Sequence, residues 1–104
     1  MQVAQGNLPA ALTSYQASLA IWERLAKSDP ANAGWQRDLS VSYEKVGNVR
    51  VAQGNLPEAL TSYQASLAIA GRLAKSDPDN AGFQNDLSLS YDRVGTGQPQ
   101  RSRV

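Results

Sequence analysis

The chain has 104 residues, 41% of them hydrophobic, and 10 Lys and Arg against 9 Asp and Glu, so its formal net charge is +1. This size suits one small domain with a modest core, and the near-zero charge gives no long-range attraction to nucleic acid. There is no Cys, which excludes disulfides and thiolate chemistry, and no His, which removes the commonest general base and metal ligand. We therefore expect no cofactor, no metal and no nucleic-acid partner.

The N-terminal segment MQVAQGNLPA has neither the charged start nor the apolar stretch of a signal peptide. No window of the sequence approaches the about 20 apolar residues of a membrane span. These features predict a cytoplasmic protein with no membrane among its partners.

Apolar residues at steps of three and four predict four helices, and no segment alternates with the two-residue period of a strand. In chain order the helices are expected to span residues 8–28, 33–53, 56–76 and 81–94. The second helix, for example, carries Trp35 and Leu39 on its apolar side and continues until Gly54.

Turn residues separate these helices. Asn55 suits the N-cap of the third helix, with Pro57 in the first turn and Glu58 completing a capping box. Pro78 ends that helix because it disfavours helical backbone at the preceding residue, and Asn80 suits the cap of the fourth helix. The pattern predicts helical hairpins, with a Gly-Asn turn on one side and a Pro-Asn turn on the other.

The sequence also repeats itself with a period of 48 residues. Residues 3–50 and 51–98 align without gaps; twelve aligned pairs differ and the other 36 are identical. Periods of about 20 to 50 residues are typical of solenoids, in which a unit buries its apolar face by stacking on a neighbour. Two copies of one unit are therefore expected to stack.

The unit resembles the tetratricopeptide repeat (TPR), whose spacing of aromatic and small residues is matched by Tyr43, Val46, Gly47, Gly54, Ala59 and Tyr63. The 48-residue unit is longer than the family's unit of about 34 residues, so each helix is expected to be about two turns longer. The resemblance spans residues 3 to about 95. It implies an all-α, antiparallel helix-hairpin solenoid of about four helices of about five turns, in which the small residues Gly47 and Ala59 let paired helices approach closely.

The resemblance further implies a concave groove lined by helices 33–53 and 81–94. Its groove-facing positions are Arg37, Val41, Glu44, Lys45, Asn48, Asn85, Leu89, Asp92 and Arg93. Five of the twelve differences between the copies fall on this face, which is either a ligand-reading surface or a solvated face free to vary. Capture of a peptide's terminal carboxylate is not expected, because Glu44 stands where a cation is needed.

The first and last complete helices are each expected to lack a neighbour on one side. The apolar residues expected to mediate self-association are Leu8, Leu12, Tyr15, Leu19 and Trp22, with Phe83, Leu87, Tyr91 and Val94 at the other end. Trp22, which is Ala70 in the second copy, is read either as an interface anchor or as a core aromatic. Burying one such side chain is worth about 1.5–3 kcal/mol, so we expect a homo-oligomer. It could be an open filament, a closed dimer, or a domain-swapped dimer through the turn between Val49 and Leu56.

Residues 1–95 are expected to form the helical domain, and residues 96–104, which contain Gly, Pro, Gln and two Arg without apolar periodicity, a disordered tail. No carboxylate pair suits catalysis, since Asp38 and Glu44 are six residues apart and point to different sides of their helix. The sequence therefore favours a non-enzymatic protein-protein interaction module that self-associates. The alternatives are an RNA-binding helical repeat, which the period and the mixed groove charges disfavour, and a domain-swapped fragment with no ligand.

Overall fold

A computed structural model describes residues 7–96 of the chain. This range contains four α-helices and no strand: α1 (Leu8–Ser28), α2 (Ala33–Ala52), α3 (Leu56–Ser76) and α4 (Ala81–Thr96). The predicted all-α class is confirmed, and each predicted helix boundary holds to within two residues. Thr96, expected to begin the tail, is the last residue of α4, and the rest of the predicted tail lies outside the described residues.

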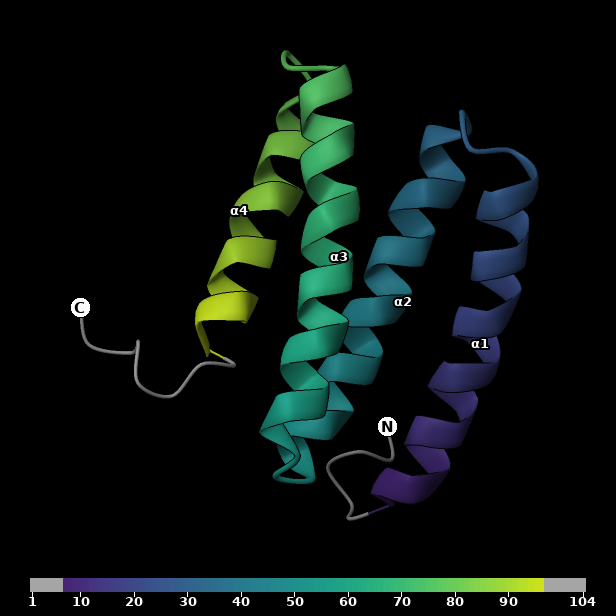
Figure 1. The fold of residues 1–104 in the computed structure, drawn as a ribbon, viewed down its shortest axis with the longest axis vertical. Coiled ribbons are helices and arrows are strands. Elements are labelled where there is room, and N and C mark those ends of the chain that lie inside the picture. The colour runs from purple at the N-terminus through teal and green to yellow at the C-terminus, as the bar shows by residue number, and fades with distance from the viewer. Residues whose placement is uncertain (1–6, 97–104) are drawn as a thin grey trace.

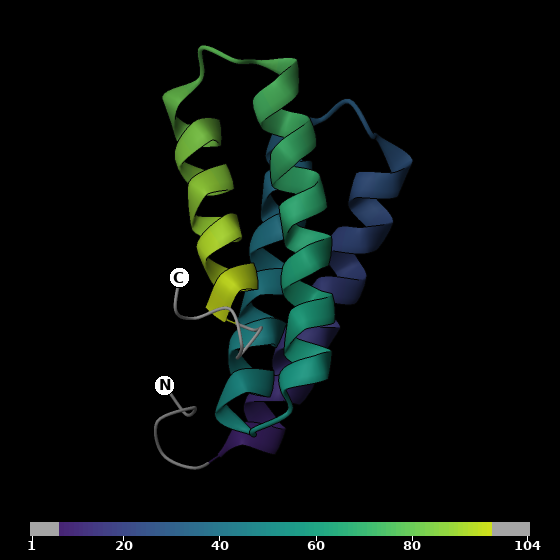
Figure 2. The ribbon, with the colours of Figure 1, turned by 60° about the vertical axis from the view of Figure 1, so that its left-hand side comes forward.

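Successive helices run in alternating directions, and α1 packs on α2, α2 on α3 and α3 on α4 (Figure 1). The end helices α1 and α4 lie on opposite sides of the molecule in both views (Figures 1 and 2). The fold measures 38 × 36 × 20 Å along its principal axes, so it is a slab about two helix diameters thick. Because α2 belongs to the first copy of the repeat and α3 to the second, the α2–α3 contact is also the contact between the copies.

The two Pro-Asn turns are built alike. In the first, Asn32 Oδ1 accepts a hydrogen bond from the backbone N–H of Trp35 at 3.0 Å, which caps α2. In the second, Asn80 Oδ1 accepts from the N–H of Phe83 at 3.0 Å, so the predicted cap of α4 is confirmed. Each cap satisfies one of the N–H groups that a helix start leaves without an intrahelical partner.

The turn before α3 differs from the prediction. Pro57 does lie in the first turn of α3, but the Asn55 side chain makes no capping hydrogen bond, so the predicted capping box with Glu58 is wrong. A capping box needs the backbone N–H of its first residue as a donor to the glutamate. Here the Asn55 N–H already donates to the carbonyl oxygen of Arg50 at 2.8 Å, because it closes the end of α2.

That closure requires a glycine. Gly54 has φ +79° and its N–H donates to the Val51 carbonyl at 2.9 Å, which together with the bond from Asn55 to Arg50 forms the two-bond Schellman arrangement at a helix end. A side chain at a positive φ is strained even where space is free, and nothing lies within 4 Å of a Cβ added here.

We expect Gly54→Ala to lower the free energy of unfolding by about 1 kcal/mol, because L-residues other than Asn and Asp avoid this backbone region. Gly54→Asn serves as the control and should cost less, since Asn tolerates the left-handed conformation. Urea denaturation measures both. Equal losses for Ala and Asn would contradict the backbone explanation.

The core joins all four helices. Ala26, Leu39, Ile69 and Leu73 form a buried cluster, against which four partly buried residues pack: Leu19, Trp22, Tyr43 and Phe83. Trp22 is therefore packed on the core. Among the described residues no buried side-chain polar atom lacks a hydrogen-bond partner.

Close packing between α2 and α3 depends on small residues. The Tyr63 ring, 3% exposed, lies against Gly47, where an added Cβ would come within 2.5 Å of Cε1 and 2.8 Å of Cδ1. Nearby, the Ser40 and Ser66 hydroxyls are buried and lie 2.8 Å apart in a hydrogen bond. The predicted close approach at Gly47 is confirmed, as is the burial of Ala59, which is 0% exposed.

Candidate interaction surfaces

The nine residues predicted to face a groove lie along one side of α2 and along α4. On α2 they recur at steps of three and four residues, which places them on one helix face. Glu44 is half-buried and the other members of the set are exposed. Val41 and Leu89 are the two large apolar side chains of the set, and both are exposed.

An ion pair joins α2 to α4 at one edge of this face. Arg37 donates from Nε to Asp86 Oδ2 at 2.6 Å and from Nη2 to Asp86 Oδ1 at 3.4 Å. The Arg37 side chain is about half exposed, so the pair contributes at most about 1 kcal/mol. Asp86 was not among the predicted groove residues. Its pairing with Arg37 depends on how close α2 and α4 lie. The spacing of apolar residues within one helix gives no information on that distance.

A second polar cluster lies where α2, α3 and α4 meet. The Tyr63 hydroxyl donates to Asn48 Oδ1 at 2.6 Å. Burial raises the pKa of the Glu44 carboxyl above its usual 4.5, while Arg93 opposes the rise and Asp86 adds to it. Burial also raises the pKa of Tyr63, which feels the opposing charges of Arg93 and Glu44. Burial is thus the main cause of both shifts, and the neighbouring charges modify it.

The raised pKa of Glu44 predicts a pH dependence of stability. Just above pH 4.5 the folded chain holds the Glu44 proton more tightly than the unfolded chain does, so stability falls as pH rises through this window. We expect Glu44→Gln to remove that fall. Urea unfolding from about pH 4 to about pH 7 measures it, with Glu58→Gln, a change at an exposed site on α3, as the control of equal charge. Parallel profiles for the parent and Glu44→Gln would contradict the prediction.

Lys45 lies on the opposite edge of the same face. Its Nζ atom is 5.8 Å from the centre of the Tyr15 ring of α1, which is a cation–π distance. Arg37 and Lys45, the two cations of the predicted α2 set, therefore each contact a neighbouring helix. Val41 of α2 and Leu89 of α4 are exposed apolar side chains among charged neighbours in sequence.

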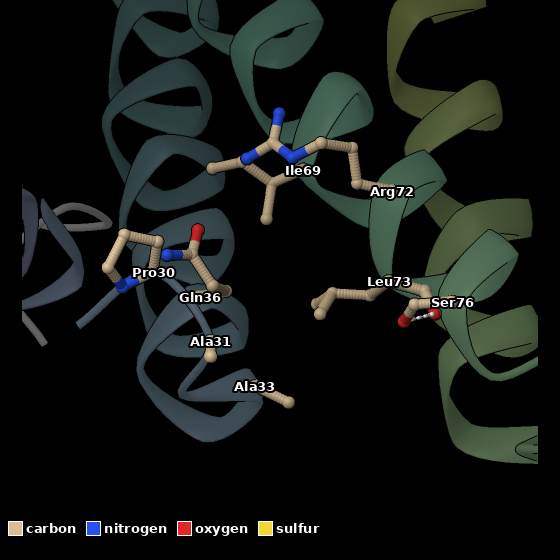
Figure 3. A pocket seen from close by; sticks show the side chains of 8 residues that line it. All are labelled: Pro30, Ala31, Ala33, Gln36, Ile69, Arg72, Leu73 and Ser76. Carbon is tan, nitrogen blue, oxygen red and sulfur yellow. Dashed lines mark hydrogen bonds between the residues drawn. The ribbon is translucent and has the colours of Figure 1, made fainter.

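A hollow of about 260 Å³ opens where α2 begins and α3 ends. Figure 3 shows Gln36 and the turn residues facing α3 across it, with Ile69 and Leu73 opposite. The eight lining residues are Pro30, Ala31, Ala33, Gln36, Ile69, Arg72, Leu73 and Ser76, and none carries a carboxylate. Its polar side-chain groups are the guanidinium of Arg72, the amide of Gln36 and the hydroxyl of Ser76, which lie beside apolar side chains. The lining contains no acid–base pair. Within residues 7–96 no three carboxylates gather in a way that could hold a metal ion.

The nine residues predicted to mediate self-association differ in exposure. Tyr91 is exposed, whereas the other eight are partly buried, and Leu19, Trp22 and Phe83 pack against the core cluster. The sequence prediction selected the largest apolar residues of each end helix. In the structure, three of them contribute to the core of their own chain.

Within residues 7–96, identical side chains of the two copies differ in exposure. Ile69 of α3 is 5% exposed, whereas the identical Ile21 of α1 is 48% exposed. Tyr43 of α2 is half-buried and donates to Glu23 Oε2 at 2.8 Å, and burial together with this bond raises its pKa to about 12. The identical Tyr91 of α4 is 61% exposed, and Gly71 stands where Glu23 stands in the first copy. Because the two isoleucines are identical, only their burial distinguishes Ile21 from Ile69.

No family model, curated protein or solved structure matches this chain. Among the described helices, none is both long and apolar enough to cross a membrane. The function must therefore be inferred from the fold and its surfaces.

Proposed function

We propose that this chain is a non-enzymatic protein-protein interaction module, a helix-hairpin solenoid of the TPR type, which associates with copies of itself through its end helices. The observation that carries the proposal is the unequal burial of identical residues, 5% for Ile69 against 48% for Ile21. A repeat buries its apolar face on a neighbour. The outer sides of α1 and α4 are the places where the described chain supplies none.

The arrangement of the helices supports a solenoid. Each helix packs on the next in chain order, and the slab of 38 × 36 × 20 Å is wide and thin, with α1 and α4 on opposite sides (Figure 2). A four-helix bundle that closes on itself would bring its first and last helices together. The separation of α1 and α4 therefore supports a solenoid whose end helices can pack on other molecules.

The surfaces support binding rather than catalysis. The groove face carries Val41 and Leu89 between charged side chains, which suits a protein or peptide segment with both apolar and charged residues. Its Arg37 is engaged with Asp86, and the hollow beside α3 has no carboxylate in its lining. We propose a protein or peptide as the occupant of the groove.

Size-exclusion chromatography with light scattering tests the self-association. We expect the mass to rise above the 11.1 kDa of one chain as the concentration increases. A constant mass of one chain up to millimolar concentration would overturn it. A salt-dependent mobility shift with single-stranded RNA would instead favour an RNA-binding repeat.

A further inference from the structure

We propose that two copies of this chain dock head to tail, α4 of one copy packing on α1 of the next as α2 packs on α3 within the chain. This inference rests on the self-association proposed above and adds to it the two faces and the residues that meet. The occupant of each uncovered end is thus a second copy of the chain.

The contact between α2 and α3 is the template. Across it Ser40 hydrogen-bonds Ser66, and the Tyr63 ring lies against Gly47. Leu39 of α2 lies in one buried cluster with Ile69 and Leu73 of α3. All seven template residues recur unchanged 48 positions away, where the counterparts on α4 are Leu87, Ser88 and Gly95 and those on α1 are Tyr15, Ser18, Ile21 and Leu25.

On α4 the three counterparts are less covered than the template residues. Ser88 is exposed although Ser40 is buried, and Leu87 is half-buried although Leu39 is buried. Nothing lies within 4 Å of a Cβ added at Gly95, whereas the Tyr63 ring occupies the space where a Cβ of residue 47 would lie. This side of α4 therefore has the shape of the α2 surface without the helix that covers it.

On α1 the complementary residues are also less buried than their counterparts. Ile21 is exposed where Ile69 is buried, and Ser18 and Leu25 are half-buried where Ser66 and Leu73 are buried. Tyr15 is likewise half-buried, while Tyr63 is buried. This side of α1 therefore carries the residues with which α3 packs on α2, but no helix of the described chain packs on it.

Joining the two faces repeats these contacts of the template. Tyr15 of one copy lies on Gly95 of the other, Ser18 pairs with Ser88, and Leu87 packs on Ile21 and Leu25. The hydrogen bond from Tyr63 to Asn48 is not repeated, because Thr96 stands at the position of Asn48. None of these residues is charged, so the contact is expected to depend little on salt. Trp22 replaces Ala70 beside this face, and its side chain already packs on the core of its own copy.

The two faces differ from each other, so the contact is heterologous and each added copy keeps one free face of each kind. Association is therefore expected to continue beyond the dimer as concentration rises. A symmetric dimer, in which one surface pairs with itself, would stop at two copies.

The test uses two glycines with matched surroundings. In a single copy, Gly95→Ala meets nothing, and replacing a helical glycine by alanine leaves the helix at least as stable. In the assembly its Cβ would collide with the Tyr15 ring of the next copy, so we expect the association constant to fall at least tenfold. Gly71→Ala, also in a helix with nothing within 4 Å of the added Cβ, should associate like the parent. Sedimentation velocity across a concentration series measures all three proteins.

A mixing experiment tests the pairing of unlike faces. Gly95→Ala disables the α4 face and Ile21→Glu disables the α1 face, so each variant alone is expected to stay near the mass of one chain. An equal mixture should form a complex of two chains that grows no further, because each variant retains the face that the other has lost.

The outcomes separate this inference from the proposed function. If the parent associates and Gly95→Ala associates equally, the faces named here are wrong while self-association stands. A symmetric dimer in the parent, or a mixture that stays at the mass of one chain, would likewise overturn the head-to-tail contact. A parent that remains at 11.1 kDa at every concentration would overturn both proposals.

Discussion

Ile69→Ala is expected to lower the free energy of unfolding by about 2–5 kcal/mol, because it removes a buried side chain from the cluster between the two copies and leaves a cavity. Ile21→Ala makes the identical change in the same SLAI sequence context, but at a side chain that is 48% exposed. We expect it to cost less than about 1 kcal/mol. Urea denaturation of both variants at a dilution where the chain is monomeric gives the two values.

The difference between these two losses tests the fold directly. The local sequence is the same up to the isoleucine and differs in the next two residues, Trp22-Glu23 against Ala70-Gly71, so the neighbouring helix is the main difference between the two sites. Equal losses would mean that the outer side of α1 is covered to the same extent as the inner side of α3. That result would contradict both the packing order and the docking faces inferred from it.

Gly47→Ala is expected to lower the free energy of unfolding by about 1–3 kcal/mol, because the added Cβ would lie 2.5 Å from Tyr63 Cε1 in a packed interface. The ring has little freedom to yield, since it is 3% exposed and its hydroxyl is held by Asn48 at 2.6 Å. Thermal and urea unfolding measure the loss. At Gly95 the same substitution meets nothing and should stabilise a single copy by up to about 1 kcal/mol.

A second substitution checks the cause of the Gly47→Ala loss. Tyr63→Leu removes the ring that the new Cβ would meet, so in the Gly47→Ala background it should cost less than it does in the parent. Additive losses for the two substitutions would show that the destabilisation arises elsewhere.

The helices could be predicted well because the evidence for each is local. Apolar residues at steps of three and four, with Pro and Asn at the turns, gave boundaries within two residues, and the repeat provided each pattern twice. The capping box at Asn55 failed because the donor it needs is already bonded to Arg50 across the preceding turn. A capping motif considers only the residues that follow the turn. It leaves out the hydrogen bonds that close the preceding helix across that turn.

The surfaces could be predicted only in part. Periodicity shows that α1 has an apolar stripe. A helix between two neighbours buries a wide part of its circumference, however, and the apolar pattern does not say which part contacts which neighbour. Leu19 was therefore assigned outward, although it packs on the core, and Trp22, read either as an interface anchor or as a core aromatic, packs on the core as well. Ile21, whose equivalent Ile69 is nearly fully buried, could be identified only by comparing the burial of identical residues.

The hydroxyl pair of Ser40 and Ser66 has a consequence for any longer stack of these units. Sliding one unit along the other by a helical turn, about 5.4 Å, would separate two buried hydroxyls and leave each without its partner, which costs about 1–3 kcal/mol per group. The Tyr63 ring, which lies against Gly47 in the same contact, resists the same slide. The serine pair and this tyrosine therefore set the rise and rotation from one unit to the next, and with them the pitch of the superhelix that repeated stacking would build.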